Sequence, residues 1–221
     1  MKKVSLTAAL YMIVLVMIFF FGCTKDDTVA PVINLSGENP LYIQLGDTWL
    51  DPGYTATDNK DGDITANVSV SHIPNPAEVN MYSVIYSVED KAGNSTTITR
   101  KVYVSSDNLV GVYAVRDSVL GTNAGVYEYN LTISQSATSF NQIIIKNFRC
   151  YGEDVLVNAT VTGSVITIPE QSPLSMPSGY EGKISGMATY QGAELKTMKY
   201  VTVFSAIGAG TDTCYSKLSK L

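Results

Sequence analysis

Apolar and polar residues alternate along two segments of the chain, and each alternation predicts a β-strand with one buried face. In residues 82–88, tyrosine and valine occupy every second position, and in residues 127–133 tyrosine, leucine and isoleucine alternate with polar residues. Side chains two positions apart lie on the same face of a strand, so each segment presents one apolar face. Beyond the N-terminal apolar run, the chain shows almost no sustained helical periodicity, which predicts an all-β protein.

Short apolar runs between clusters of glycine, proline and aspartate fill residues 28–104. Such clusters are typical of turns, and the runs between them have the length of strands. Residues 89–94 form one such turn, between the strand at residues 82–88 and a last strand that ends near residue 104. We therefore expect about seven short strands arranged as a small β-sandwich.

Residues 110–221 contain a second series of strand-like segments with short connections. This pattern favours an antiparallel meander that is either closed into a barrel or folded into a sandwich. Three prolines within residues 169–177 interrupt the series, because proline cannot donate a hydrogen bond to a strand ladder. The expected strands are residues 110–115, 127–133, 140–148, 155–161, 165–168, 183–190, 196–204 and 213–218.

An apolar run at residues 6–21 follows Lys2 and Lys3 and ends at Gly22 and Cys23. A positive start, an apolar stretch and a small residue before the cleavage point are the parts of a cleavable export signal. The run is shorter than the roughly 20 residues of a membrane-spanning helix. The alternative is an uncleaved N-terminal anchor helix that ends in a buried or free thiol. In both cases the body of the protein is held outside the inner membrane.

The cysteine directly after this run resembles the lipobox of bacterial lipoproteins, in the looser form typical of Bacteroidota. The resemblance implies removal of residues 1–22 as a signal peptide and attachment of lipid to Cys23. Several acyl chains on one residue anchor a protein firmly, since each buried CH₂ contributes about 0.8 kcal/mol. Residues 23–28 then form an acidic tether, and residues 25–27 (KDD) resemble the signal that sends such lipoproteins to the outer face of the outer membrane. A merely solvated tether is the alternative.

Composition and motifs narrow the classes of function. The formal net charge of the chain is −5, which argues against nucleic acid as a partner because nucleic-acid binding needs a basic surface. The one histidine, His72, lies in an expected loop, and no Cys-x-x-Cys, His-Glu-x-x-His or phosphate-binding glycine loop occurs. Most nucleophilic and acid–base enzymes use such groups. We therefore expect a protein that is not an enzyme.

The motifs APVI, LG, DPG, DGDIT and YSVIYSVED followed by GN occur in this order within residues 28–104. Together they resemble the bacterial surface immunoglobulin-like (Ig-like) domain that is also found in insecticidal crystal proteins. The resemblance implies an Ig-like sandwich that acts as a spacer in a surface protein. It also implies a structural role for Trp49, which precedes the DPG turn. Such a likeness predicts architecture more than activity.

A weaker resemblance covers residues 110–221, which follow a short linker at residues 105–109. The sequences GVYAV and VLVNATVTGSVITIPEQ resemble the C-terminal domain of Bacteroidota surface lipoproteins that pair it with the Ig-like module. These lipoproteins are often encoded beside starch-utilisation-type glycan uptake systems, and the domain also resembles a lipocalin-like barrel. The resemblance implies a polysaccharide or oligosaccharide ligand and an outer-membrane transporter as a partner.

Tyrosines are the candidate sugar-binding residues of this second region. Sugar recognition uses aromatic faces that pack on pyranose rings, with amides and carboxylates that bind the hydroxyl groups. Tyr151 and Tyr180 lie beside glycines in expected loops and are the candidate ligand-binding residues. Tyr127 and Tyr129 lie on the apolar face of their strand, and we expect them in the core.

Residues 58–63 (DNKDGD) gather oxygen ligands within one turn, and a further aspartate follows the strand at residues 82–88. Calcium binds oxygen ligands of this kind. The alternative is an Asx turn, in which Asp58 and Asp61 cap backbone amides and Gly62 supplies a positive φ. The candidate calcium ligands are Asp58, Asp61, Asp63 and Asp90.

Cys150 and Cys214 are the two cysteines that remain after lipid attachment. In an oxidising compartment such a pair can form a disulfide bond. Two buried free thiols are the equal alternative.

These observations together predict a lipid-anchored outer-membrane protein that faces the cell exterior. The Ig-like domain acts as a spacer, and the C-terminal domain captures extracellular glycan without catalysis and with no cofactor other than calcium. Two alternatives stay open: a structural or adhesive protein that binds another protein, and a lipocalin-like carrier of a small ligand.

Overall fold

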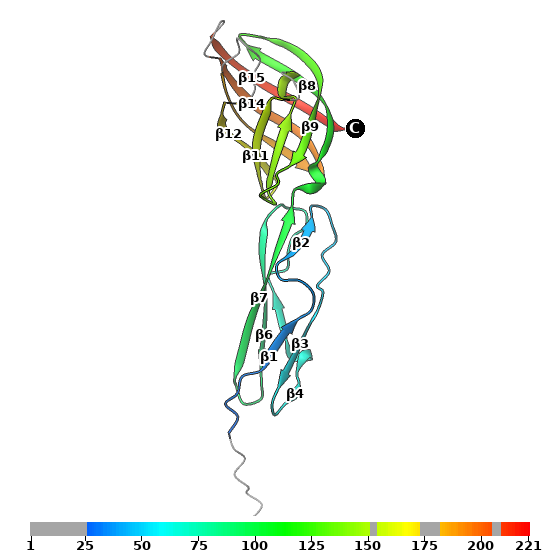
Figure 1. Cartoon of the computed structure of the whole chain (residues 1–221), viewed down its shortest axis with the longest axis vertical. Coiled ribbons are helices and arrows are strands. Elements are labelled where there is room, and N and C mark those ends of the chain that lie inside the picture. Colours follow the sequence, from blue (N-terminus) through cyan, green and yellow to red (C-terminus); the bar gives the residue numbers. More distant parts are fainter. Residues whose placement is uncertain (1–25, 151–153, 173–181, 205–208) are drawn as a thin grey trace, which may run out of the picture.

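The computed structural model describes residues 26–150, 154–172, 182–204 and 209–221. These residues form strands joined by turns and three short 3-10 helices, which confirms the all-β prediction. A two-sheet sandwich and a closed barrel lie end to end along the longest axis of the molecule (Figure 1). Among the described residues, no helix combines the length and the hydrophobicity needed to cross a membrane.

The sandwich contains seven strands and one 3-10 helix. Its elements are β1 (Val32–Leu35), β2 (Leu41–Gln44), β3 (Tyr54–Asp58), β4 (Gly62–Asp63), η1 (Thr65–Asn67), β5 (Ser69–Ser71), β6 (Met81–Glu89) and β7 (Ser95–Ser105). One sheet has the order β1-β3-β4 and the other the order β2-β7-β6-β5. Neighbouring strands are antiparallel, except that β2 runs parallel to β7. The turn between β6 and β7 places Gly93 at φ 92°, a conformation that glycine adopts without strain.

The core of the sandwich lies between its two sheets. Ile33 and Ala56 of the first sheet pack with Val84, Tyr86 and Val102 of the second. The buried positions of β6 are those that the alternation in residues 82–88 predicts, since a strand with one apolar face must cover that face. The sole tryptophan packs partly buried against this core, in agreement with a structural role.

Arg100 also occupies an inward position of β7 and is fully buried. Its Nε donates a hydrogen bond of 3.3 Å to the hydroxyl of Tyr86. Its two terminal nitrogens donate to backbone carbonyls of the loops on either side of β2, at Glu38 (2.6 Å), Ser36 (2.7 Å) and Gly53 (3.2 Å). A buried charge is tolerated only when it is hydrogen-bonded in this way, so Arg100 joins these loops to the second sheet.

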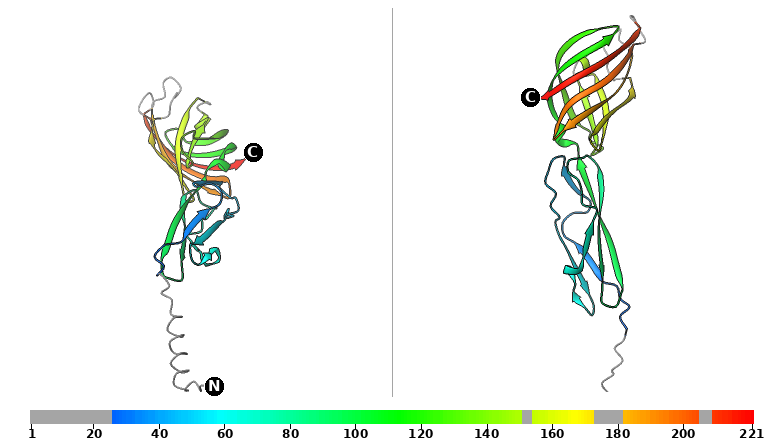
Figure 2. Two further views of the ribbon diagram at one scale, coloured as in Figure 1. Left: turned by 60° about the horizontal axis from the view of Figure 1, so that its bottom comes forward. Right: turned by 180° about the vertical axis from the view of Figure 1, so that it is seen from behind.

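The barrel contains eight strands, all antiparallel to their neighbours. Its elements, with the two 3-10 helices that precede and interrupt it, are η2 (Asp107–Leu109), β8 (Gly111–Gly121), β9 (Gly125–Gln135), β10 (Gln142–Lys146), η3 (Phe148–Cys150), β11 (Leu156–Thr162), β12 (Val165–Gln171), β13 (Gly182–Gln191), β14 (Glu194–Phe204) and β15 (Gly210–Lys220). Each strand pairs with the next along the chain, and β15 pairs with β8 to close the ring. Figure 2 shows the tilted strands around the barrel. Because β15 pairs with β8, this region is a closed barrel and not a folded sandwich, the other arrangement that the sequence allowed.

Two local features shape the barrel wall. A Cβ atom at Gly186 would lie 2.5 Å from the carbonyl oxygen of Lys199 and 2.6 Å from Cβ of Tyr200, so glycine permits the close approach of β13 to β14. The expected strand at residues 140–148 ends early, at the last residue of β10. Asn147 (φ 52°) and Arg149 (φ 56°) adopt left-handed conformations there, which a strand does not accommodate.

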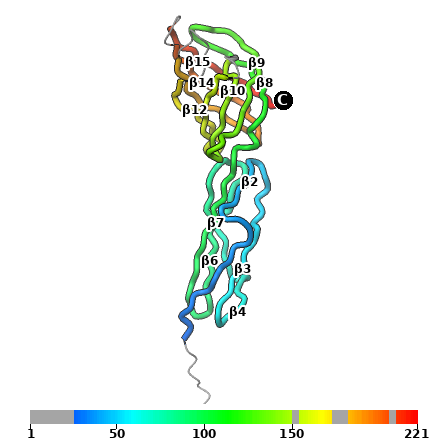
Figure 3. The backbone as a smooth tube through the Cα atoms, in the orientation of Figure 1, coloured from blue at the N-terminus to red at the C-terminus, as the bar shows by residue number. Residues whose placement is uncertain are grey.

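The sandwich and the barrel share one hydrophobic cluster. Leu45, Val79 and Val104 of the sandwich belong to the same buried cluster as the barrel core. Val79 and Gly163 also exchange two backbone hydrogen bonds, of 3.2 and 3.0 Å, across the junction. The tube of the chain continues from β7 into β8 at this junction (Figure 3), and η2 lies between these two strands in the sequence. Residues 105–109, expected as a linker, are therefore a packed connection.

Candidate functional site

A groove of about 450 Å³ lies where the sandwich meets the barrel. We call it the junction groove. It is lined by Tyr42 and Tyr103 of the sandwich, Asp107 of η2, and Gln135 and Phe140 at the barrel side, among others. The parallel pairing of β2 with β7 places Tyr42 beside Tyr103. Their rings are stacked, with centroids 5.0 Å apart and an interplanar angle of 16°, and Phe140 meets Tyr103 edge-on at 4.8 Å.

Polar groups surround this aromatic stack. The Oδ1 atom of Asp107 is buried and has no hydrogen-bond partner among the described residues. Gln135 exposes its amide, and the hydroxyls of Ser136 and Thr138 lie 3.2 Å apart. Tyr42 itself is 59% exposed. An exposed aromatic ring beside amide, hydroxyl and carboxylate groups matches the chemistry of a sugar-binding site.

A second groove, of about 510 Å³, lies on the barrel wall over β13, β14, β15 and β8. Tyr215 is 45% exposed there, and the Nζ atom of Lys199 lies 5.3 Å from the centroid of its ring. Among the described residues that line this groove, none has an amide or carboxylate side chain. Its polar side chains are hydroxyls and the cations of Arg116, Lys199 and Lys217, whereas the junction groove also offers an amide and a carboxylate.

The barrel interior contains a buried polar cluster. Oδ2 of the fully buried Asp117 accepts hydrogen bonds from the hydroxyls of Tyr129 (2.8 Å) and Tyr200. Burial raises the pKa of both tyrosines, so both hydroxyls keep their protons and act as donors. Three buried oxygens of this interior have no hydrogen-bond partner among the described residues: Asp117 Oδ1, Thr202 Oγ1 and Ser216 Oγ.

A buried ion pair lies near this cluster. Nη2 of Arg149 is 2.8 Å from Oδ2 of Asp212, and both side chains are buried. Asn123 adds hydrogen bonds to Asp212 from its backbone nitrogen (2.8 Å) and its side-chain amide (3.0 Å). Burial alone would raise the pKa of Asp212, but the bonds from Asn123 and the charge of Arg149 outweigh it and lower that pKa. The pair is satisfied and joins η3 to β15.

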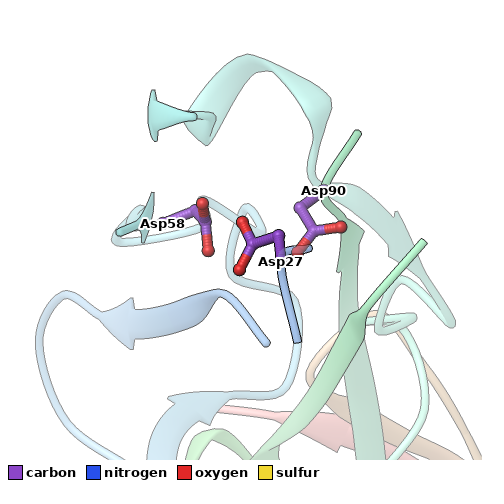
Figure 4. Close-up of side chains that lie close together, drawn as sticks. All are labelled: Asp27, Asp58 and Asp90. Atoms are coloured by element: carbon purple, nitrogen blue, oxygen red, sulfur yellow. The ribbon is translucent and has the colours of Figure 1, made fainter. Parts of the chain in front are cut away.

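Three carboxylates meet at the end of the sandwich that lies away from the barrel (Figure 4). Asp27 precedes β1, Asp58 is the last residue of β3, and Asp90 follows β6. One oxygen of each lies within 4.8 Å of the other two. Two unit charges 4 Å apart repel by about 4 kcal/mol at an effective dielectric constant of about 20. Among the described residues, no ion pair involves any of these three side chains.

The other two candidate calcium ligands have different partners. Asp61 accepts hydrogen bonds from the backbone nitrogen (2.8 Å) and Nζ (2.9 Å) of Lys91, and these bonds lower the pKa of Asp61. Oδ1 of Asp63 accepts a bond of 2.9 Å from the backbone nitrogen of Thr65. The structure thus brings two of the four candidates, Asp58 and Asp90, into one cluster.

The Asx turn also forms. Oδ1 of Asp58 accepts hydrogen bonds of 2.8 Å from the backbone nitrogens of Lys60 and Asp61, and Gly62 has φ 74°. These donors, with Asp61 first, lower the pKa of Asp58. They occupy one oxygen of the carboxylate and leave Oδ2 buried and without a hydrogen-bond partner among the described residues. The turn and the carboxylate cluster therefore coexist at Asp58.

Of the two alternatives for Cys150 and Cys214, a disulfide or two free thiols, the structure shows a free thiol at Cys214. Cys214 occupies an inward position of β15 and is a fully buried free thiol, and burial raises its pKa to about 11. The side chain of Cys150 lies outside the described part of the chain. So do Cys23, Tyr151 and Tyr180, the expected lipid-attachment and ligand-binding residues.

Tyr127 departs from its expected place in the core. It is 41% exposed, because it lies toward the end of the β8–β9 hairpin rather than inside the ring of strands. Its hydroxyl donates to the carbonyl oxygen of Asn123 at 3.1 Å. Tyr129, two residues further along β9, is half-buried and packs against the barrel core as expected.

Sequence reasoning missed several residues of these sites, among them Tyr42, Asp117 and Asp27. The exposed Tyr42 could have been found as the outward residue between two apolar neighbours of a short strand. Asp117 could have been found as a carboxylate on the inward face of a strand, between Val115 and Val119. Asp27 has no such signal, because only folding brings the start of the chain to the loops of Asp58 and Asp90.

Comparison with known proteins identifies the sandwich. Residues 33–104 match the family model described as bacterial surface protein, Ig-like domain. The chain therefore contains an Ig-like domain of the bacterial surface type, as its motifs predict. No curated protein is significantly similar to the chain.

Three solved structures are similar over most of the chain at low identity. A lipoprotein from Bacteroides thetaiotaomicron is 20% identical, with 85% of this chain and 99% of that chain covered and a TM-score of 0.34. A protein of unknown function from Nostoc punctiforme is 11% identical (76% and 82% covered, TM-score 0.31). The CBM51-2 and INT domains of ZmpB from Clostridium perfringens, in complex with GlcNAc, are 20% identical (86% and 44% covered, TM-score 0.29). TM-scores this low carry no argument about function.

Proposed function

We propose that this chain is a lipid-anchored surface protein that captures extracellular glycan, without catalysis, in the junction groove. The observation that carries the proposal is the stacked pair of Tyr42 and Tyr103 in a groove that is also lined by the polar residues Asp107 and Gln135. The Ig-like domain of the bacterial surface type at residues 33–104 supports a location on the cell surface.

The aromatic ring and the polar side chains of the groove each match one part of a sugar. The apolar face of a pyranose ring packs on an aromatic ring, and Tyr42 is the most exposed ring of the stack. The hydroxyl groups of the sugar can donate to Asp107 and bind the amide of Gln135.

The arrangement of the two domains suits capture at a distance from the membrane. The described chain begins at the end of the sandwich that lies opposite the barrel (Figure 2). Lipid on Cys23 would therefore leave the junction groove and the barrel directed outward, with the sandwich as the spacer. We extend the proposal to an outer-membrane transporter that receives the glycan, on the strength of the sequence resemblance of residues 110–221 to domains encoded beside glycan uptake systems.

The test is a glycan-array and affinity-gel screen of the chain from Thr24 onward, which contains every described residue. We expect retention by at least one polysaccharide and no release of cleaved product. Tyr42→Ala should weaken retention about tenfold, since aromatic packing contributes about 0.5–1.5 kcal/mol beyond the area it buries. Tyr215→Ala is the matched control, because that tyrosine is similarly exposed but lies in the barrel groove.

The outcomes test separately whether the chain binds glycan and where on the chain the glycan binds. Loss of retention in Tyr42→Ala but not in Tyr215→Ala supports capture in the junction groove. Loss in Tyr215→Ala alone would move the site to the barrel wall and overturn the assignment of the groove. Absence of retention on plant, host and microbial polysaccharides would overturn glycan capture, and a protein partner would then be sought by pull-down.

The lipid anchor has a separate test. The full chain expressed in a Bacteroidota host should incorporate labelled fatty acid and fractionate with the outer membrane. Cys23→Ser should abolish the label and release the protein from that fraction. Equal labelling of the variant would contradict lipid attachment at Cys23.

A further inference from the structure

We propose that Asp27, Asp58 and Asp90 bind a divalent cation, Ca²⁺, which fastens the N-terminal tether to the free end of the Ig-like sandwich. The site differs from the turn at residues 58–63 that the sequence suggests, since it takes one ligand from the tether and two from separate loops. It lies at the opposite end of the sandwich from the junction groove and does not depend on glycan capture.

The first support is the convergence of charge. The three carboxylates come from segments that are distant in sequence, and one oxygen of each lies within 4.8 Å of the others. Asp58 and Asp90 are buried and Asp27 is half-buried. Among the described residues no ion pair neutralises any of them. Burial of several like charges without a counter-charge is unfavourable, and a bound cation removes that repulsion.

The second, independent support is the orphan oxygen of Asp58. This side chain is nine-tenths buried, its Oδ1 already accepts two backbone N–H groups, and its Oδ2 has no donor among the described residues. Figure 4 shows the carboxylate beside Asp27. A buried carboxylate oxygen with no donor needs a partner, and a metal ion can serve as that partner without any proton.

The ligand set favours calcium over the other common ions. All three ligands are carboxylate oxygens, whereas Zn²⁺ in proteins is bound mainly by cysteine and histidine. Mg²⁺ demands near-ideal octahedral geometry, but Ca²⁺ accepts six to eight oxygens in irregular arrangements. Carboxylates from three loops, some bidentate and with water completing the shell, fit the second description.

Asn94 hydrogen-bonds to two of the three proposed ligand residues and fixes their positions. Its side-chain amide donates to Oδ2 of Asp90 at 2.8 Å and to the backbone carbonyl of Asp27 at 3.3 Å. Its backbone nitrogen donates to Oδ1 of Asp90 at 2.8 Å. The hairpin turn between β6 and β7 therefore already contacts the tether at the proposed site, and the ion would strengthen that contact.

The consequence for the surface protein rests on the proposed lipid anchor. Asp27 follows the predicted lipidated cysteine by four residues, and four residues span at most about 14 Å when fully extended. A cation at Asp27 would hold the sandwich within that distance of the lipid. Without the ion, the tether would keep its hydrogen bonds to Asn94 and would be held less firmly.

The experiment is a calorimetric titration of the chain from Thr24 onward with CaCl₂, with MgCl₂ in a parallel titration. We expect one Ca²⁺ per chain, a dissociation constant of about 10⁻⁴–10⁻³ M as in other extracellular modules, and weaker binding of Mg²⁺. Asp58→Asn keeps the shape of the side chain and should weaken Ca²⁺ binding at least tenfold, since loss of an outer-shell partner alone costs about 10–100-fold. Asp61→Asn, in the same turn but bonded to Lys91, is the matched control.

A second variant, outside both sheets, shows whether a loss of Ca²⁺ binding is due to the lost ligand or to misfolding. Asp27→Ala lies before β1 and outside both sheets, so the sandwich should fold, yet Ca²⁺ binding should weaken as in Asp58→Asn. Hydrogen exchange at residues 26–31 should slow when Ca²⁺ is added to the wild-type chain and should not change in Asp27→Ala. No heat of binding at 10 mM CaCl₂, tighter binding of Mg²⁺, or equal affinity in Asp27→Ala or Asp58→Asn would each overturn the proposal. Glycan retention is measured separately, so failure of either proposal is distinguishable from failure of the other.

Discussion

Arg100 in the sandwich and Asp117 in the barrel are both fully buried, and their hydrogen-bonding groups are satisfied to different degrees. In the sandwich, every nitrogen of the Arg100 guanidinium has an acceptor, and three of those acceptors are loop carbonyls. In the barrel, Asp117 receives two tyrosine hydroxyls on one oxygen and nothing among the described residues on the other. The buried charge of the sandwich thus completes its architecture, whereas the barrel interior keeps unused hydrogen-bonding capacity.

This difference bears on where ligand chemistry resides. Buried polar atoms without partners are rare in native proteins, and an ordered water often serves them. In the barrel such atoms lie inside a ring of strands and are shielded from macromolecules. The sandwich carries its unsatisfied atom, Oδ2 of Asp58, at its free end, where an ion can reach it. Asp107 lines the junction groove between the two domains, but its unpartnered Oδ1 is buried.

The largest effect should follow from breaking the satisfied charge of the sandwich. Arg100→Met would leave three loop carbonyls without their donor and Asp51 without its nearest cation, at 4.0 Å. We expect a loss of about 3–5 kcal/mol in the free energy of unfolding, the range for removal of one partner from a buried ionic network. Denaturant unfolding followed by the fluorescence of Trp49, which packs on the sandwich core, measures it.

Arg116→Met is the matched control for that change. Its side chain is exposed and lies 3.2 Å from the exposed Glu128, and exposed pairs of this kind contribute about 0–1 kcal/mol. A loss in Arg100→Met no larger than in Arg116→Met would show that the loops do not depend on the buried guanidinium.

Alkaline pH should have the next largest effect, and it should act mainly through the tyrosines of the barrel. Burial raises the pKa of Tyr129 and Tyr200 in the barrel, and it raises the pKa of Tyr113 to about 12. In the unfolded chain these tyrosines ionise near pH 10. A raised pKa favours the protonated form in the folded state, so its stabilisation is complete below about pH 10 and is lost as the pH rises above that value.

Each such tyrosine lowers the free energy of unfolding by up to about 1.4 kcal/mol for each pH unit above pH 10. The sandwich has fewer tyrosines of this kind, with Tyr86 as its most buried. Because the two domains share one hydrophobic cluster, we expect the tyrosine circular-dichroism signal and the fluorescence of Trp49 to be lost together at alkaline pH. Tyr129→Phe should move this transition to higher pH, and a transition that the variant leaves unmoved would contradict the assignment to the barrel tyrosines.

Much of the architecture follows from the alternation in the sequence. The one-face pattern of residues 127–133 predicts a barrel strand, and Leu131 and Ile133 are indeed fully buried. The same pattern fails for Tyr127, because periodicity indicates the face of a residue but not how far the ring of strands extends beyond it. For Arg100, the alternation of its neighbours predicts an inward position correctly. The sequence does not show how a cation is tolerated there, because the loop carbonyls that accept its hydrogen bonds come from distant segments.

The sites were less accessible to sequence reasoning than the fold was. The acidic turn contains Asp58, but Asp27 of the same carboxylate cluster comes from the tether, and no local spacing connects Asp27 with Asp58. The junction groove combines β2, β7, η2 and the segment around Phe140, which become neighbours only when the two domains pack. A site formed by segments that are distant in sequence has no sequence motif, because the pattern of each segment reflects only its own strand or turn.

The smallest effect should come from loosening the contact between the two domains. The hydroxyl of Tyr190 in β13 accepts a hydrogen bond of 3.2 Å from the backbone nitrogen of Val79 in the sandwich and donates to the carbonyl oxygen of Gly163. Tyr190→Phe removes both bonds and keeps the ring. Because Val79 and Gly163 also bond directly to each other, we expect a loss of only about 1 kcal/mol.

That loss should fall on the coupling between the domains rather than on either core. In the wild-type chain the shared hydrophobic cluster should make the Trp49 and tyrosine signals unfold together in denaturant, whereas Tyr190→Phe should separate their midpoints. Tyr127→Phe, which removes an exposed hydroxyl bonded within the barrel, is the control and should keep the midpoints together. Midpoints that already differ in the wild-type chain would mean that the sandwich and the barrel are independent despite their common core. The junction groove would then be lined by two bodies that can separate.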